Sequence, residues 1–225
     1  MNNENLALKI CNIDKTFNDA RVLENINLEV RKSEILGLAG SSGSGKSTLL
    51  RCIQKLDVPD SGEIKCDCKV GFMFQDFQLF PHMTVLQNLV YAPSLKRKKD
   101  KEQFVDQAMD MLKSLGMESK ASEYPKTLSG GQKQRAALVR SLMTKPDILL
   151  CDEPTSGLDV ATIIDVVSLL KSINELGVTL IIASHDLDFL TKIANRVVLI
   201  KKGKIAVDVE LSKQTDPVSY LREYY

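Results

Sequence analysis

The sequence EILGLAGSSGSGKST, residues 34–48, contains a short apolar segment, a loop rich in glycine and serine, and the start of a helical pattern. The apolar run Glu34–Ala39 is typical of a buried strand, and a helical pattern begins near Lys46. Gly40–Ser47 fits the phosphate-loop pattern G-x-x-x-x-G-K-[ST]. A chance match in a chain of this length has odds on the order of 1 in 100. The stretch therefore predicts a strand, a phosphate-binding loop and a helix in succession.

The chemistry of this loop follows from its residue types. Glycines let the backbone curl so that successive N–H groups face phosphate oxygens, and the helix N-terminus adds unpaired donors. Lys46 is expected to reach the terminal phosphates, and the Ser47 hydroxyl is expected to ligate Mg²⁺. The predicted nucleotide contacts here are Gly40, Ser41, Ser42, Gly43, Ser44, Gly45, Lys46, Ser47 and Thr48. By itself the loop indicates only a nucleoside triphosphate site.

A second apolar segment, DILLCDE at residues 147–153, ends in two acids. Carboxyl ends of parallel strands border the ligand crevice, so we expect Asp152 to hold Mg²⁺ beside Ser47. Glu153, one residue further, is placed to polarise an attacking water molecule. An isolated acidic pair after an apolar run is usually a solvated strand end. The upstream phosphate loop is what favours a hydrolytic site.

The remaining pattern predicts an α/β fold. Alternating residues at 6–13 and 22–30 predict strands, and 61–73 predicts two short ones. Apolar residues recur at helical spacing between 79 and 144. Further strands are expected at 148–151, 178–183, 196–200 and 204–209, and helices near 160–176 and 187–194. Strands interleaved with helices favour a parallel sheet covered on both faces.

We interpret residues 1–225 as one domain, in which 1–78 and 145–225 form the core with a small β subdomain. Residues 79–144 are expected to form an inserted helical subdomain. The segment Lys201-Lys202-Gly203-Lys204 predicts a hairpin turn. Pro217 is expected to break the tail at 211–225, for which the pattern predicts no role.

Composition excludes several classes of protein. Thirty basic and twenty-nine acidic residues leave a net charge of +1, which argues against a nucleic-acid surface. No apolar run approaches the ~18–20 residues needed to cross a bilayer, and the first residues lack a signal-peptide pattern. Five cysteines without a framework spacing suit a reducing cytoplasm. Cys66 and Cys68 could ligate a metal, but two small hydrophobes near a strand is the plainer interpretation.

The segment LSGGQ, residues 128–132, lies twenty residues before the acidic strand and begins a helix. Together with the phosphate loop and Asp152-Glu153, it closely resembles the signature sequence of the ATP-binding-cassette family. The resemblance implies a P-loop NTPase fold with a RecA-like core sheet, a small antiparallel β subdomain and an inserted helical subdomain. It also implies that two copies pair head to tail around ATP and Mg²⁺. Each copy would then contact the other's nucleotide through Ser129, Gly130, Gly131 and Gln132.

Other positions match the family singly. Gln75 resembles the glutamine that contacts Mg²⁺ and the attacking water. Asp159, in the segment SGLD at 156–159, resembles the loop that crosses the dimer interface. His185 lies where the family has its γ-phosphate-contacting histidine, although a lone histidine after a strand is more often a surface residue. Phe17 occupies the place of the aromatic residue that stacks on adenine, and a core aromatic is the alternative.

The resemblance to the family covers residues 6–209. Three segments within this range resemble one branch of the family in particular. Residues 42–53, 59–64 and 74–85 look like the polar amino-acid uptake branch, to which glutamine, histidine and arginine importers belong. The implied partners are membrane permease subunits and a solute-binding protein, at the cytoplasmic side of the membrane. Only eight residues separate Gly62 from Gly71, where relatives usually carry an extra strand pair. We therefore expect a shortened β subdomain.

Competing functions remain open at this point. Lipoprotein-release and small export complexes use similar cassettes, and the motifs encode neither direction nor solute. A soluble ATP switch acting on nucleic acid is less favoured, because neither coiled coils nor a second cassette is present. The basic run at 96–101 is interpreted as a solvated loop, with lipid headgroups as an alternative partner. The apolar loop residues Phe77, Leu79, Phe80, Met83 and Val85 either pack in a core or line a groove for a permease helix.

Overall fold

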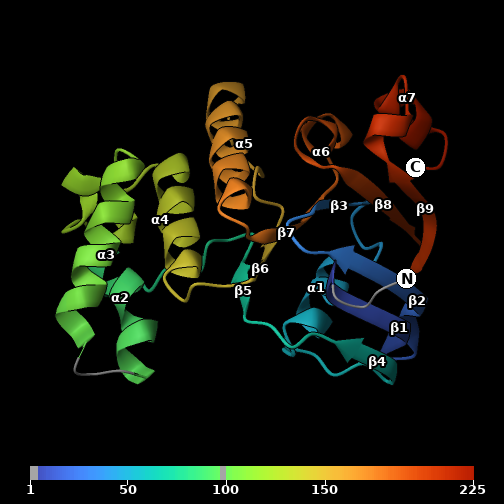
Figure 1. Ribbon diagram of the computed structural model, residues 1–225, viewed down its shortest axis with the longest axis horizontal. Helices are drawn as coiled ribbons and strands as arrows, with labels where there is room; N and C mark the ends of the chain where they lie inside the picture. The colour runs from blue at the N-terminus through green and yellow to red at the C-terminus, as the bar shows by residue number, and fades with distance from the viewer. Residues whose placement is uncertain (1–4, 97–99) are drawn as a thin grey trace.

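A six-stranded sheet forms the centre of the computed structural model, which describes residues 5–96 and 100–225 (Figure 1). The strand order is β5-β6-β7-β3-β8-β9, parallel except where β9 pairs antiparallel with β8. The strands are β3 (Ile35–Ala39), β5 (Val70–Met73), β6 (Ile148–Asp152), β7 (Thr179–Ser184), β8 (Arg196–Lys201) and β9 (Lys204–Glu210). Because β3, β6 and β7 are buried throughout, their sequences are mainly apolar, with polar residues at the ends of β6 and β7. The predicted α/β class is confirmed.

The two faces of this sheet are covered by different elements. Alternate side chains of β6, such as Leu149, pack with α5 (Val160–Glu175) and α6 (Leu187–Ile193). The intervening ones, such as Leu150, pack with α1 (Lys46–Ile53) and the three-stranded sheet. The period of two along a strand thus divides the core into two clusters, one on each face.

A second, three-stranded sheet has the antiparallel order β2-β1-β4. Its strands are β1 (Leu6–Phe17), β2 (Ala20–Arg31) and β4 (Ser61–Lys65). Asp14 of β1 joins all three, because its carboxylate accepts hydrogen bonds from Arg21 Nη2 (2.5 Å), the Asn25 N–H (3.1 Å) and the Ser61 hydroxyl (2.8 Å). These bonds lower the pKa of Asp14 to about 2, with the Arg21 hydrogen bond the largest cause.

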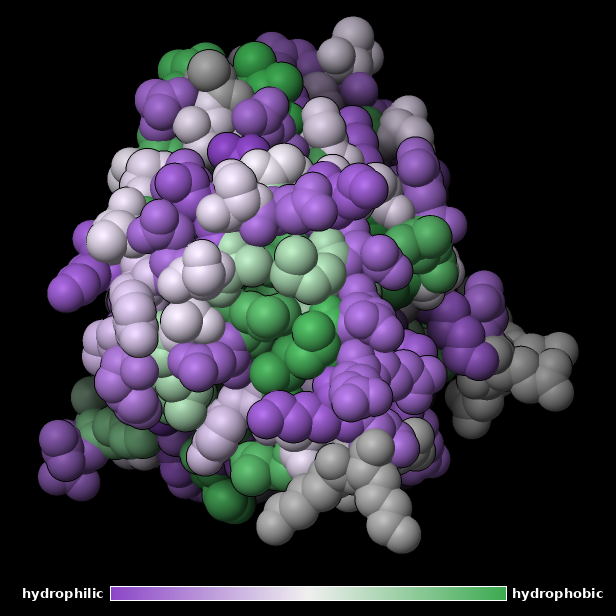
Figure 2. Space-filling view, turned by 90° about the vertical axis from the view of Figure 1, so that its left-hand side faces the viewer, coloured by the Kyte–Doolittle hydropathy of each residue, from purple (hydrophilic) through white to green (hydrophobic). Residues whose placement is uncertain are grey.

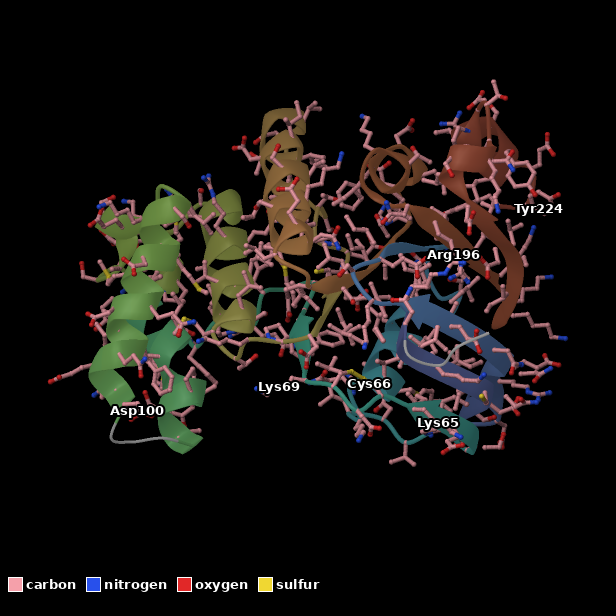
Figure 3. The ribbon with its side chains drawn as sticks, viewed as in Figure 1. Lys65, Cys66, Lys69, Asp100, Arg196 and Tyr224 are labelled. Carbon is pink, nitrogen blue, oxygen red and sulfur yellow. A yellow bond between two sulfur atoms is a disulfide. The ribbon has the colours of Figure 1, made fainter. Side chains whose placement is uncertain are left out.

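The connection from β4 to β5 differs from the expectation for its cysteines. Cys66 and Cys68 are joined by a disulfide, with their Cα atoms 5.3 Å apart (Figure 3). Neither interpretation made from the sequence, a metal site or two free hydrophobic thiols, is therefore correct. One intervening residue in a tight connection is enough to bring two cysteines within bonding reach. No strand forms at 66–69, so the segment is short, as expected.

Helices with a core of their own form a unit beside the sheet, at the left of Figure 1. They are α2 (Val85–Lys96), α3 (Lys101–Ser114), α4 (Gly130–Leu142) and the 3₁₀ turns Glu118–Lys120 and Pro125–Thr127. Ala108 and Leu112 lie buried in this core, within the segment 79–144 for which apolar residues at helical spacing predicted helices. Most of the basic run at 96–101 falls outside the described residues. Among the described helices, none combines the length and apolarity needed to span a membrane.

The chain after β8 matches one expectation and contradicts another. Lys202 (φ 51°) and Gly203 (φ 76°) form the two-residue turn of the β8–β9 hairpin, as predicted. Pro217, in contrast, does not break the tail but begins α7 (Pro217–Arg222). Asp216 caps this helix by accepting a hydrogen bond from the Ser219 N–H (3.1 Å), and proline is well tolerated at the first helical position.

The bonds of Asp14 predict a pH-dependent contribution to stability. Replacing it by Asp14→Asn should lower Tm at pH 7, because the carboxylate that joins the three strands loses its charge. The folded pKa of about 2 lies below the usual 3.8, so the stabilisation is present above pH 3.8 and is lost as pH falls towards 2. The Tm deficit, measured by circular dichroism, should therefore shrink at acidic pH. Asp19→Asn in the exposed β1–β2 turn is the matched control, and a deficit that stays constant with pH would contradict the prediction.

Candidate functional site

The phosphate loop connects β3 to α1 and takes a shape that two of its glycines permit. Gly40 (φ 151°) and Gly45 (φ 111°) have positive φ angles. A Cβ on Gly40 would lie 2.4 Å from the Ile200 carbonyl oxygen, and one on Gly45 would lie 2.7 Å from the Val22 carbonyl oxygen. Both positions therefore exclude larger residues. The Ser44 hydroxyl is buried without a hydrogen-bond partner among the described residues, and a phosphate oxygen would satisfy it.

Lys46 lies buried beneath the loop. Its Nζ donates hydrogen bonds to the carbonyl oxygens of Gly40 (2.7 Å) and Ser41 (3.2 Å) and lies 3.7 Å from Glu153 Oε1. Burial lowers the pKa of Lys46, and the negative charges of Glu153 and Asp152 act in the opposite direction. The ammonium group is therefore held between the loop and the acidic end of β6.

Asp152 ends β6 directly beside the start of α1. Ser47 Oγ donates a hydrogen bond to Asp152 Oδ1 (3.0 Å), and Asp152 is only 9% exposed. Burial raises the pKa of Asp152, whereas the hydrogen bond from Ser47 lowers it. A hydroxyl and a buried carboxylate are hard oxygen ligands of the kind that Mg²⁺ prefers. The donor set at this point fits that ion.

Glu153 follows β6 in a left-handed conformation (φ 48°). Its N–H donates to the Ala183 carbonyl oxygen (2.9 Å), which continues the pairing of β6 with β7. Its Oε2 lies 2.9 Å from His185 Nδ1 and accepts a hydrogen bond from the Ser184 hydroxyl (3.2 Å). Non-glycine residues with positive φ cluster at functional sites. Here the backbone turn aims the carboxylate towards Lys46 and the residues after β7.

These elements surround a hollow of about 270 Å³. It is lined by Val22, Ser42, Gly43, Ser44, Gly45, Lys46, Ser47, Thr48, Gln75, Glu153 and His185. Gln75, Glu153 and His185 thus come together with the phosphate loop, from three separate connections after strands. The arrangement can hold a phosphate chain and place a carboxylate beside it.

Phe17 and the residues predicted to act across a dimer interface do not line this hollow. Phe17 is exposed at the end of β1, with Lys15 Nζ 5.0 Å from its ring centre, and does not line the hollow. Ser129 and Gln132 form a reciprocal capping box at the start of α4, with Gly130 and Gly131 in the first turn of that helix. Asp159 caps α5 by accepting a hydrogen bond from the Thr162 N–H (2.9 Å). Neither helix start lines the hollow within one chain.

The loop after Gln75 is held in an unusual conformation. Phe77 (φ 61°) and Gln78 (φ 44°) are consecutive left-handed residues. Arg140 of α4 donates from Nη2 to the Phe77 carbonyl oxygen (2.8 Å) and from Nη1 to the Gln78 carbonyl oxygen (2.6 Å). Burial lowers the pKa of Arg140. Because a guanidinium group offers its donors in a rigid fork, Arg140 binds the carbonyl oxygens of both left-handed residues at once.

Sequence reasoning missed three residues that support the site. They are Ser184, Arg140 and Gln134, which donates a hydrogen bond from Nε2 to the Pro154 carbonyl oxygen directly after Glu153. Ser184 offered a signal, because it is a polar residue at the end of an apolar strand and directly precedes His185. The other two lie within the pattern of α4 and contact main-chain atoms 20 and 62–63 residues away, which a local pattern does not reveal.

Comparisons with known proteins agree on one family. A family model described as "ABC transporter" matches residues 23–156. The chain is 39% identical to the arginine transport ATP-binding protein ArtM of Bacillus subtilis, over 89% of this chain and 90% of that protein. It is 40% identical to the glutamine transport ATP-binding protein GlnQ of Escherichia coli, over 88% of each. The general L-amino acid transport ATP-binding protein AapP of Rhizobium johnstonii is also 40% identical, over 96% of this chain and 87% of that protein.

Solved structures show the same fold. The dimeric post-hydrolysis state of the ATP-binding cassette MJ0796, bound to ADP and Pi, superposes with a TM-score of 0.83 at 33% identity. That similarity covers 91% of this chain and 98% of the other. The cbiO1 subunit of the ABC transporter complex cbiONQ, from Clostridium perfringens, gives a TM-score of 0.84 at 28% identity over 98% of this chain and 92% of that one.

The contacts of Arg140 predict that it stabilises the loop after Gln75. Arg140→Met should lower the free energy of unfolding by about 1.5–3 kcal/mol, the usual value for a hydrogen bond that involves a charged group. Amide hydrogen exchange at 75–84 should accelerate, because Phe77 and Gln78 lose the hydrogen-bond donor that they share. Urea unfolding and exchange mass spectrometry measure the two effects.

Arg135→Met is the matched control for this prediction. Arg135 lies on the same helix, and among the described residues it donates one longer hydrogen bond, to the Leu115 carbonyl oxygen (3.4 Å). We expect a smaller loss of stability and normal exchange at 75–84. Equal exchange at 75–84 in the two variants would show that Arg140 does not hold the loop.

Proposed function

This chain belongs to the ABC transporter family, and from that premise we propose that it is the ATP-binding and ATP-hydrolysing subunit of a membrane transporter that takes up polar amino acids. The observation that carries the hydrolytic part is the meeting of Lys46, Asp152 and Glu153 at one edge of the sheet. The named functions of the relatives, which are arginine, glutamine and general L-amino acid transport, support the class of solute. The motifs do not choose one amino acid.

Each side chain has a defined role in hydrolysis. The adenine ring stacks on Phe17, which is worth roughly 1–3 kcal/mol for a base on an aromatic ring. Lys46 and the loop N–H groups hold the phosphates. Glu153 accepts a proton from water as the water attacks the γ-phosphate in line, and the bond to the β-phosphate breaks to give ADP and phosphate. His185 and Gln75 hold the γ-phosphate in the geometry for that attack.

Ser47 and Asp152, with Gln75, are the residues that would hold Mg²⁺. When bound, the ion supplies positive charge that neutralises the phosphate oxygens. Asp152 is already aligned for this by its hydrogen bond with Ser47.

A second copy of the chain completes the site. Ser129 and Gly130 are exposed at the N-terminus of α4, where backbone N–H groups favour an anion. They do not line the hollow of their own chain. A head-to-tail pair brings this helix start onto the γ-phosphate held by the other copy, with Asp159 at the interface. The similar cassette MJ0796, whose solved structures are dimeric, supports the pairing of two copies.

The role of Glu153 predicts the behaviour of Glu153→Gln. The variant should bind ATP and form dimers, but its kcat should fall by about 10²–10⁴-fold because the general base is lost. Phosphate release measures turnover, and light scattering with ATP measures the mass of the complex.

Glu175→Gln at the exposed end of α5 provides the matched control and should hydrolyse ATP at the wild-type rate. Normal turnover by Glu153→Gln would refute the assignment of the base. A Glu153→Gln protein that binds ATP yet stays monomeric would instead contradict the head-to-tail pair.

The permease docks on the helical unit. A groove of about 620 Å³ there is lined by His82, Met83, Gln87, Val90, Tyr91, Ser94, Leu95 and Lys101. Figure 2, which faces this unit, shows a hydrophobic patch surrounded by hydrophilic side chains. Tyr91 and Leu95 are exposed, and Phe80 packs edge-on against Tyr91 with ring centres 5.6 Å apart. A short amphipathic helix of a membrane permease fits such a surface.

Only part of the apolar loop contributes to this groove. Phe77 and Leu79 pack against the sheet core and the helical core respectively, and Val85 is fully buried. Phe80 is exposed beside the groove, and Met83 lines it. The two interpretations of the loop thus apply to different residues. On this proposal the subunit acts at the cytoplasmic face of the membrane, and a solute-binding protein delivers the amino acid from the other side.

The groove predicts where permease binding is lost. Leu95→Glu should abolish co-purification with the permease, because it places a charge on a surface that an apolar helix must cover. Val58→Glu, at an exposed apolar residue outside the groove, is the matched control and should co-purify normally. Both variants are checked for folding by Tm. Wild-type co-purification of Leu95→Glu would place the docking site elsewhere.

A further inference from the structure

The tail after β9 folds back over the elements that carry His185. Leu221 of α7 is fully buried in the core cluster that contains α5 and α6. Arg222 Nη2 lies 3.4 Å from Asp188 Oδ2 on α6. In Figure 1 α7 lies next to α6, with the end of the chain beside β8 and β9. The tail therefore packs against the helix that begins two residues after His185.

The last two residues continue this return towards the phosphate loop. Lys201 Nζ donates hydrogen bonds to the main-chain oxygens of Tyr224 (2.9 Å) and Tyr225 (2.8 Å). The two side chains then take different directions. Tyr224 packs on Tyr220 with ring centres 5.3 Å apart and lies at the outer edge of the molecule (Figure 3). The Tyr225 hydroxyl donates a hydrogen bond to the His185 carbonyl oxygen (2.9 Å).

The surroundings of the Tyr225 hydroxyl belong to the candidate site. Burial raises the pKa of Tyr225, the charges of Glu153 and Asp186 raise it further, and the Gly40 backbone lowers it through a hydrogen bond. The hydroxyl thus lies near the first residue of the phosphate loop and the acidic end of β6. None of the roles proposed for hydrolysis uses it.

His185 and Asp186 are the two residues that connect β7 to α6. Ser184 ends β7, and Asp186 caps α6 by accepting a hydrogen bond from the Phe189 N–H (3.0 Å). The imidazole itself is exposed, with 59% of its side-chain surface accessible, and its Nδ1 lies 2.9 Å from Glu153 Oε2. Glu153 thus contacts the ring of His185, and the Tyr225 hydroxyl binds its carbonyl oxygen.

We propose that Tyr225 is a positioning residue for His185, which it holds in line with Glu153 through the hydrogen bond to the His185 carbonyl oxygen. The proposal rests on the function proposed above, in which His185 holds the γ-phosphate. Lys201 supports the arrangement, because its two hydrogen bonds fix the main chain from which the Tyr225 ring extends.

The first test observes the histidine ring without any turnover. The chain has two histidines, His185 and His82, and His82 lies in the groove of the helical unit. In the full-length protein, Tyr225→Phe should shift the Cε1–H NMR signal of His185 and leave that of His82 unchanged. Lys201→Met should shift the His185 signal in the same direction. Tyr224→Phe, which removes the neighbouring hydroxyl, should shift neither.

The second test measures steady-state hydrolysis with ATP and Mg²⁺. Tyr225→Phe should lower kcat by about two- to tenfold, the range expected for one hydrogen bond, with KM for ATP unchanged. In a His185→Ala background, Tyr225→Phe should have no further effect, because the residue acts through His185. Tyr224→Phe should match the wild type.

Three results would overturn the proposal. They are an unchanged His185 signal in Tyr225→Phe, a wild-type kcat for that variant, and an equal fold-loss in the His185→Ala background. A residue that only braces the tail would lower Tm and leave the His185 signal in place. If the proposed function is wrong, the wild-type protein will not hydrolyse ATP. The NMR test does not depend on turnover, so it still decides whether Tyr225 positions His185.

Discussion

The site depends on the sheet pairing that brings Ser47 and Asp152, 105 residues apart, within the distance of a hydrogen bond. The hydrogen bond forms because β3 and β6 both pair in parallel with β7, so the phosphate loop and the acidic strand end emerge at the same edge. The register is set by burial on both faces of these strands. A slip of one residue in β6 would turn Asp152 towards the opposite face and place Cys151 at the strand end. Apolar packing therefore determines where the carboxylates lie.

Three residues with a strained backbone lie after the strands that carry the site. Glu153, Phe77 and Gln78 are non-glycine residues with positive φ angles, each costing on the order of 1–3 kcal/mol. Each is held by contacts from elsewhere in the fold. The Glu153 N–H is bound by Ala183, and the carbonyl oxygens of Phe77 and Gln78 are bound by Arg140. The surrounding elements thus impose conformations that these segments would not adopt alone, which gives the Glu153 carboxylate and the Gln75 loop fixed directions.

The sequence predicted those features that leave a local pattern. The phosphate loop, the apolar strands and the Lys202-Gly203 turn follow from residue type and period, and the structure has each of them. Pro217 was placed wrongly although Asp216-Pro217 is a recognisable cap and first helical position. The Cys66–Cys68 disulfide was not predicted, because the cysteines do not have the spacing of a disulfide framework. Hydrogen bonds from side chains to distant main-chain atoms, such as those of Arg140, leave no periodic signal. Except at Ser184, the supporting contacts of the site could therefore not be predicted before the fold was known.

Helix α4 links the segment at Ser129 to two main-chain segments beside the hollow, one next to Glu153 and one after Gln75. Its first residue follows Ser129, Gln134 in its middle binds the Pro154 carbonyl next to Glu153, and Arg140 near its end binds the loop after Gln75. Thirteen residues span about 20 Å as one rigid rod. On the proposed function, a displacement of the helical unit by a permease in its groove would act on the main chain beside Glu153 and on the main chain after Gln75 together, because α4 binds both. His185 lies outside this connection and is reached from the opposite side, through the tail. On the proposed function, docking at the groove would therefore reach the hollow through α4, on the side of Glu153 and Gln75.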